Sequence, residues 1–282
     1  MTLSEFNALQ AEDVSNQLYA CCSSKKWLAG IMKGFPFADE NDLVSKAEHS
    51  WYETCNEADW LEAFSHHPKI GDIKSLTEKF AGKEQESVGT APVHLIEALA
   101  TANAAYEDKF GFIFIVCATG KPAAEMLRLL QDRLANSREE ELAIAMGEQH
   151  KITIIRLRKM LVNAQWQSLT ASQLTTHVLD TSLGIPGKDI TIRLKRQLNN
   201  GWRTMAQGVT NSDGRIADLL PPGRLLKAGN YRMQFETGAY FDSIHVKGFY
   251  PSVEIEFTVF DDSHYHVPLL INPYGYSTYR GS

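Results

Sequence analysis

The sequence predicts two domains, an all-α domain at the N-terminus and an all-β sandwich at the C-terminus. Up to about residue 165, apolar residues recur every three or four positions, which is typical of amphipathic helices. From residue 174 onward, apolar and polar residues alternate, which is typical of strands with one buried face. The chain has 282 residues, 44% of them hydrophobic, enough for two cores. We therefore expect domains at residues 1–165 and 174–282, with a linker at 166–173.

The helices of the first domain have recognisable ends. Residues 95–110 carry one apolar face, and Gly111 follows as a C-cap. Residues 121–136 predict a second amphipathic helix. Ser137, which is followed by glutamates, predicts a capping box at the start of a long helix that runs toward Trp166.

The strands of the second domain are short and punctuated by turns. Apolar residues alternate with polar ones at 190–195 and at 253–259. Asn200-Gly201 is a typical two-residue hairpin turn, and residues 211–214 predict another turn. Short antiparallel strands over this length favour a sandwich over a parallel sheet with crossover helices.

Composition narrows the possible partners. The net charge is −6 and no run of lysine or arginine occurs, so we expect no nucleic-acid or acidic-lipid partner. The longest apolar stretch, residues 112–118, is too short to span a bilayer, and we expect neither a signal peptide nor membrane attachment. The four cysteines lack the spacing of zinc ligands or of a disulfide framework. These features predict a cytoplasmic protein with reduced thiols and a small-molecule ligand.

Three histidines and one arginine are candidates for chemistry in the β domain. His177 on an apolar strand is, taken alone, more typical of a core residue than of a catalyst. His264 and His266 share a strand face, which suits either a metal site or an acid/base pair. Arg215 follows a turn and is either solvated or a forked donor to a planar anion. The aromatic residues that follow, up to residue 282, suggest that this end is anchored in a site.

Four stretches of the β domain resemble 5-hydroxyisourate hydrolase, the transthyretin-related enzyme of purine breakdown. They are residues 174–186, 210–215 (TNSDGR), 249–251 (FYP) and 264–282, which ends in YRGS. The resemblance implies a transthyretin-like sandwich, assembled as a tetramer with active sites between subunits, and a metal-free hydrolysis. It makes catalytic residues of His177, Arg215, His264, His266 and Ser282, and substrate contacts of His177, Arg215 and Tyr279.

These residue types suit the hydrolysis. Imidazole has an unperturbed pKa near neutrality, so a histidine is able to deprotonate a water molecule there. A guanidinium pairs with planar oxygens and offsets charge that develops on a carbonyl oxygen.

The helical domain has less obvious candidates. His67 precedes a proline, after a tryptophan-rich helical stretch at 51–64, and therefore lies at a helix end, where a histidine often only interacts with the helix dipole. Glu84-Gln85 lies in a polar stretch that suits a solvated loop or a helix start. Residues 112–118 have a β-rich composition that is unusual in a helical domain.

Together these stretches resemble 2-oxo-4-hydroxy-4-carboxy-5-ureidoimidazoline (OHCU) decarboxylase, an all-helical family. The matching stretches are residues 60–64, 67–72 (HPKIGD), 84–85, 106–118 and 156–157. The resemblance makes His67 catalytic, with Glu84 as its partner, and implies no cofactor. Ala81 occupies a position where many members have serine. Alanine has no hydroxyl, so the resemblance implies that one contact to the substrate is missing. The residues expected to cradle the substrate are Pro68, Gln85 and the extended backbone of Phe114, Ile115, Val116, Cys117 and Ala118.

The two resemblances fit together, because the product of the hydrolase is the substrate of the decarboxylase. They imply a bifunctional enzyme that converts 5-hydroxyisourate into (S)-allantoin, assembled through β-domain tetramers and helical-domain dimers. Two alternatives stay open. One is a transthyretin-like carrier with a helical oligomerisation module. The other is a zinc hydrolase of another substrate, which uses the histidines as ligands.

Overall fold

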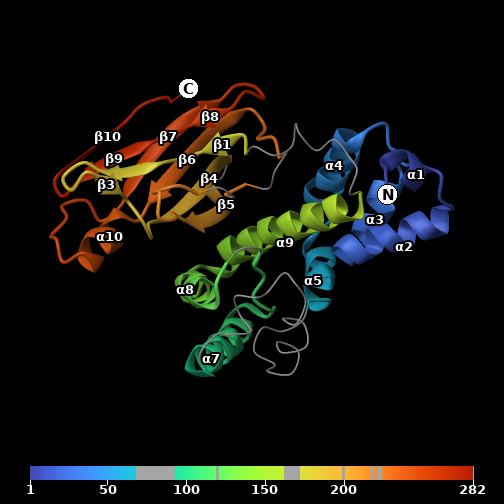
Figure 1. Cartoon of the computed structure of the whole chain (residues 1–282), viewed down its shortest axis with the longest axis horizontal. Coiled ribbons are helices and arrows are strands. Elements are labelled where there is room, and N and C mark those ends of the chain that lie inside the picture. Colours follow the sequence, from blue (N-terminus) through green and yellow to red (C-terminus); the bar gives the residue numbers. More distant parts are fainter. Residues whose placement is uncertain are drawn as a thin grey trace. The chain divides into compact units, whose positions relative to one another are not determined.

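The computed structural model describes residues 1–67, 93–118, 121–161, 172–198, 201–216, 219–220 and 224–281 (Figure 1). The chain divides into two compact units, Met1–Trp166 and Gln167–Ser282. The first unit is helical in its described part, and the second is built mainly from strands. The expected combination of an all-α and an all-β architecture is confirmed.

The helical unit is organised around its longest described helix, α9 (Arg138–Met160), which contacts α2, α5 and α7. Buried aromatic side chains fill the space between the helices and still satisfy their polar atoms. The Trp51 indole, for example, donates to the carbonyl of Met146 on α9 at 3.0 Å. The other helices are α1 (Leu3–Asn7), α2 (Ala11–Cys22), α3 (Lys25–Met32), α4 (Glu40–His49), a π-helix (Ser50–Thr54), α5 (Glu57–Ser65), α7 (Val93–Phe110) and α8 (Ala123–Arg133).

Two predicted helix ends are confirmed. Gly111 follows α7 with a φ of 77°, a left-handed conformation that glycine adopts at little cost, and its N–H donates to Glu107 at 2.8 Å. Before α9, the Ser137 hydroxyl accepts from the backbone N–H of Glu140, while the Glu140 carboxylate accepts from the N–H of Ser137. This reciprocal pair is the predicted capping box.

Three helix predictions need correction. The stretch at 51–64 is not one helix, because the π-helix ends at Thr54 and the Asn56 side chain then caps a new helix, α5. The helix predicted at 121–136 is shorter, at Ala123–Arg133. The helix predicted to run toward Trp166 ends at Met160, where Leu161 leaves the helical conformation.

Strands form two four-stranded sheets in the described part of the second unit, ordered β10-β9-β2-β3 and β5-β4-β6-β7, with a short pair β1-β8. Their inner faces share one buried core: Val178 and Leu269 come from the first sheet, and Ile192 and Met233 from the second. The strands are β1 (Leu174–Thr175), β2 (Val178–Asp180), β3 (Ile185–Pro186), β4 (Thr191–Leu198), β5 (Gly201–Val209), β6 (Gly229–Phe235), β7 (Val253–Val259), β8 (Tyr265–His266), β9 (Leu269–Asn272) and β10 (Gly275–Thr278).

The predicted alternation is confirmed on β4, because Ile192 and Leu194 are fully buried between more exposed neighbours. Gly201, predicted to lie in a hairpin turn, is instead the first residue of β5 and pairs with Leu198, while residue 200 lies outside the described residues. A short helix, α10 (Thr237–Ser243), was not predicted; its Tyr240 hydroxyl donates to Asp180 at 3.0 Å and docks it on β2.

None of the helices described here has an apolar stretch long enough to cross a membrane.

Candidate active sites

In the β unit, the Thr175 hydroxyl joins two of the predicted histidines. Strands β1 and β8 run parallel, with Thr175 opposite His266. The Thr175 oxygen lies 3.0 Å from Nε2 of His264 and 2.9 Å from Nδ1 of His266. His264 and His266 therefore share a face, as the alternation predicted. A hydroxyl has one proton and two lone pairs, so Thr175 donates to at most one imidazole and accepts an N–H from at least one of them, which links the tautomers of the two rings.

His177 and Arg215 are brought together by the turn at residues 211–214. The two residues form an isolated antiparallel bridge, and the N–H of Val178 donates to the carbonyl of Gly214 at 2.8 Å. The Asn211 side chain accepts from the N–H groups of Asp213 and Arg215, at 2.9 and 3.0 Å, which closes the turn. Gly214 has a φ of 70°, and a Cβ there would lie 2.3 Å from the carbonyl oxygen of Val178, so the bridge requires glycine.

Burial and neighbouring charge keep two of these histidines neutral. Burial lowers the pKa of His177, and the Arg215 guanidinium lowers it further. A hydrogen bond with the backbone of Asp213 raises this pKa but does not cancel the other two effects. The pKa of His266 is lowered by burial and then by Arg215, His264 and His177. A histidine with a lowered pKa is unprotonated at neutral pH and able to accept a proton.

The end of the described chain packs on His266. The N–H of Gly281 donates to the His266 carbonyl at 3.0 Å, and a Cβ on Gly281 would lie 2.3 Å from Cδ2 of the His266 ring. The anchoring of this end is thus visible up to Gly281, and Ser282 lies outside the described residues. Tyr279 is 61% exposed, and its hydroxyl has no hydrogen-bond partner in the described part of the chain. Within that part, no group of histidine, cysteine or acidic side chains is arranged to hold a metal ion.

In the helical unit, His67 contacts a residue that the sequence did not suggest. Its N–H donates to the Phe64 carbonyl just after α5, and its Nε2 lies 2.6 Å from Oε1 of Gln149 on α9. The Gln149 side chain is fully buried, and its amide nitrogen donates to the Thr153 hydroxyl. Glu84, the partner expected from the resemblance, and Pro68 and Gln85 lie outside the described residues.

The hydrogen bonds of Thr153 assign the proton on His67. The Thr153 hydroxyl donates to the backbone carbonyl of Gln149 at 3.0 Å, so its oxygen accepts the Gln149 amide N–H. The carbonyl oxygen of the Gln149 side chain therefore faces His67, whose Nε2 carries the donated proton. No distinct signal in the sequence marks Gln149, because it lies in the polar stretch 148–151 (EQHK), which resembles an exposed part of a helix.

The segment expected to cradle the substrate lies in neither a helix nor a strand, and it is buried up to Cys117. It follows α7 and precedes α8, and Phe114, Ile115, Val116 and Cys117 are each at most 8% exposed. Its backbone is bonded by side chains of both following helices. Arg133 of α8 donates to the Ile115 carbonyl at 2.8 Å, and Glu148 of α9 accepts from the Cys117 N–H at 2.7 Å.

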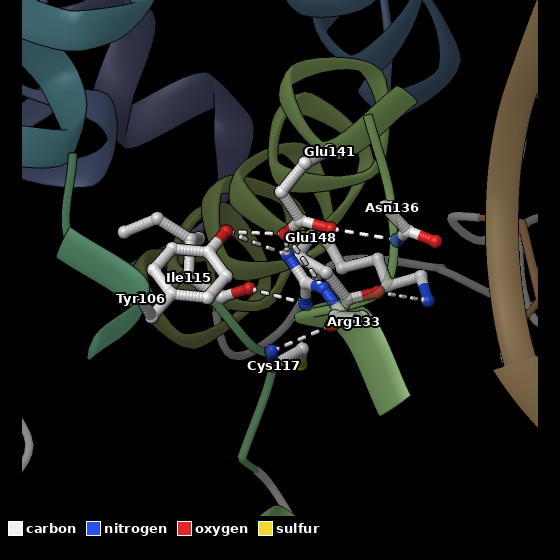
Figure 2. A network of polar contacts seen from close by, with 8 residues as sticks. Tyr106, Ile115, Cys117, Arg133, Asn136, Glu141 and Glu148 are labelled. Carbon is white, nitrogen blue, oxygen red and sulfur yellow. Dashed lines mark hydrogen bonds and ion pairs between the residues drawn. The ribbon is translucent and has the colours of Figure 1, made fainter. Parts of the chain in front are cut away.

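A buried polar network holds these two side chains (Figure 2). Arg133 forms an ion pair with Glu141, whose carboxylate also accepts from the Tyr106 hydroxyl and from the Asn136 amide. Burial raises the pKa of Tyr106, so this hydroxyl remains a donor. Glu148 pairs with Lys151 at 2.6 Å.

Comparison with known proteins accounts for both units. The model of the OHCU decarboxylase family matches residues 7–158, and that of the HIUase/Transthyretin family matches residues 174–281. The uric acid degradation bifunctional protein TTL of Arabidopsis thaliana is 31% identical, over 93% of this chain and 96% of that protein. The 5-hydroxyisourate hydrolase of Salmonella dublin is 42% identical, over 43% of this chain and 91% of the hydrolase. A crystal structure of (S)-allantoin synthase aligns over 100% of both chains, with 24% identity and a TM-score of 0.44. The chain therefore belongs to the OHCU decarboxylase family through its helical unit and to the HIUase/Transthyretin family through its β unit.

Proposed function

We propose that this chain catalyses two consecutive steps of urate degradation. Its β unit hydrolyses 5-hydroxyisourate to OHCU, and its helical unit decarboxylates OHCU to (S)-allantoin. The observation that carries this proposal is the presence of both families on one chain, together with its likeness along nearly its whole length to a bifunctional protein of uric acid degradation. The Arabidopsis protein matches across both units.

In the hydrolysis, a neutral histidine takes a proton from water as the water attacks a ring carbonyl. The ring C–N bond then breaks, and the proton returns to the departing nitrogen. His177 and His266 suit the base because burial and Arg215 lower the pKa of both. Arg215 pairs with the substrate oxygens and stabilises charge on the attacked carbonyl. Through Thr175, His264 is able to exchange a proton with His266. Tyr279 and Ser282 complete the proposed site as further contacts.

In the decarboxylation, the C–C bond to the carboxylate breaks and carbon dioxide leaves. The electron pair stays in the conjugated ring and takes up one proton, so no cofactor is required. His67 delivers this proton or polarises the ring, and Glu84 is its proposed partner. The contact between Nε2 of His67 and Oε1 of Gln149 supports an orienting role for Gln149, which fixes the plane of the imidazole ring. Pro68, Gln85 and the backbone at 114–118 hold the substrate so that the proton reaches one face.

The test uses freshly made 5-hydroxyisourate and circular dichroism. The unmodified chain should produce optically active (S)-allantoin faster than the uncatalysed reaction. His67→Ala should leave hydrolysis intact and abolish the optical signal, whereas His177→Ala should slow hydrolysis. Racemic product at the uncatalysed rate with the unmodified chain would overturn the proposal. Loss of both steps in His67→Ala would overturn the division of labour between the units.

We further propose domain boundaries at 1–165 and 174–282, joined by a linker at 166–173. We propose a tetramer formed through the β unit, with dimer contacts through the helical unit. Exposed aromatic side chains on the β unit support an interface; Phe249 and Tyr276 are 68% and 44% exposed. Light scattering on the purified chain tests the assembly.

We also propose a cytoplasmic location, which suits four cysteines that are all buried thiols.

A further inference from the structure

Four charged side chains are buried around one short segment of the helical unit. Arg133, Glu141, Glu148 and Lys151 are 3%, 0%, 7% and 5% exposed. Burying an ion pair costs solvation that the pairing roughly offsets, so such pairs are weak evidence for stability. Their position therefore calls for another explanation, and two of the four bond the backbone at 115–117.

These two contacts fix alternate residues of the segment. Arg133 holds the carbonyl of Ile115, and Glu148 holds the N–H of Cys117, two residues further on (Figure 2). Val116 lies between these two anchored residues, and neither charged side chain bonds its own N–H or C=O.

Val116 has unused hydrogen-bonding capacity. It is 8% exposed, and in the described part of the chain neither its N–H nor its C=O has a partner. Buried backbone groups are almost always paired, so a bound molecule is the natural partner for this donor and acceptor. An adjacent N–H and C=O complement a planar amide or ureido group, which offers one acceptor and one donor.

We propose that Glu148 and Arg133 are positioning residues for the decarboxylation: they anchor the segment so that the Val116 N–H and C=O bind the amide or ureido edge of the substrate. This inference rests on the proposed function of the helical unit. The remaining members of the network hold the two anchors in place. Glu141, bonded by Tyr106 and Asn136, orients Arg133, and Lys151 orients Glu148.

The test compares Glu148→Leu with Glu148→Gln in the full chain. Leucine removes the acceptor for the Cys117 N–H, whereas the carbonyl oxygen of glutamine replaces it. Decarboxylation is followed by circular dichroism with OHCU supplied by an excess of a separate hydrolase. We expect Glu148→Leu to raise the KM and to lower kcat/KM on the order of 10²-fold, as misplacement of a binding group does. Glu148→Gln should stay within about tenfold of the unmodified chain, because an uncharged hydrogen bond is about half as strong.

Two controls separate positioning from folding. Hydrolysis of 5-hydroxyisourate by the same variants should be unchanged. If Glu148→Leu unfolds the helical unit, the double variant Glu148→Leu with Lys151→Met removes both charges at once, which is often neutral for stability. It should refold the unit and keep the loss in kcat/KM. A purely structural role predicts restored kinetics in that folded double variant.

A direct readout is the backbone amide resonance of Val116. Addition of the product (S)-allantoin should shift this resonance in the unmodified chain, and the shift should shrink in the Glu148→Leu protein. An unchanged Val116 resonance at saturating (S)-allantoin, or a Glu148→Leu chain with the KM and kcat of the unmodified chain, would overturn the inference. Stereoselective decarboxylation that survives His67→Ala would instead overturn the proposed function, so the two failures are distinguishable.

Discussion

Replacing Thr175 with valine tests whether the two histidines of the β unit act as a coupled pair. Valine has nearly the shape of threonine but lacks the hydroxyl that lies 3.0 Å from His264 and 2.9 Å from His266. The replacement therefore removes two hydrogen bonds and little volume. The two imidazoles then lose the hydroxyl that both of them contact, and with it the link between their orientations.

The expected loss follows from those two bonds. Each is worth about 0.5–1.5 kcal/mol net, so together they contribute about 1–3 kcal/mol. If this energy is expressed in the transition state, kcat/KM for 5-hydroxyisourate falls about 5- to 150-fold, since about 1.4 kcal/mol corresponds to a factor of ten. The fall is measured by the absorbance decay of freshly made 5-hydroxyisourate in a stopped-flow instrument.

Thr175→Ser is the matched control, because serine keeps the hydroxyl and loses only a methyl group. It should retain most of the activity, and decarboxylation of OHCU should be unaffected in both variants. A Thr175→Val enzyme within twofold of the unmodified chain would refute the coupling. Equal impairment of Thr175→Ser would assign the effect to packing of the methyl group instead.

Three further predictions follow from the contacts at the two sites. Arg215→Gln should slow hydrolysis and move the acid limb of its pH–rate profile to higher pH, because the lost cation no longer lowers the pKa of His266; an unmoved limb would contradict this. Gly281→Ala should slow hydrolysis about tenfold or more, because its Cβ would lie 2.3 Å from the His266 ring; decarboxylation of OHCU supplied by a separate hydrolase should be normal, and unchanged hydrolysis would contradict the prediction. Gln149→Leu removes the acceptor for the Nε2 proton of His67, so we expect about a tenfold fall in decarboxylation with full hydrolysis, and equal rates for both proteins would exclude this role.

Local signals in the sequence were enough for much of the fold. The capping box at Ser137 and the left-handed Gly111 depend on residues within a few positions of each other, and both are confirmed. The break at Asn56 was missed because the stretch at 51–64 is rich in tryptophan on both sides of it. Only the Asn56 side chain, which caps the next helix, marks the start of α5. Helix α10 was missed because its docking depends on Asp180, which is distant in sequence.

In the candidate sites, too, local patterns predicted some features, while contacts between distant segments were missed. Alternation along one strand placed His264 and His266 on one face, but the residue that joins them, Thr175, comes from a strand almost a whole domain earlier in the sequence. Gln149 was likewise invisible, because a buried glutamine on a helix acquires a role only when a separate helix end brings His67 to it. Contacts between distant segments arise from packing, which no local pattern encodes.

The charges around residues 115–117 also restrict how this unit is able to diverge. Loss of one member of a buried ion pair leaves its partner as an unpaired buried charge. This lowers the free energy of unfolding by about 3–5 kcal/mol, which is a large part of the stability of a typical domain. For stability alone, single substitutions that leave a charge unpaired at Arg133, Glu141, Glu148 or Lys151 are therefore costly, whereas paired exchanges that remove both charges cost less. Across related chains, we therefore expect the two members of each ion pair to be replaced together or both retained, even where the surrounding residues differ.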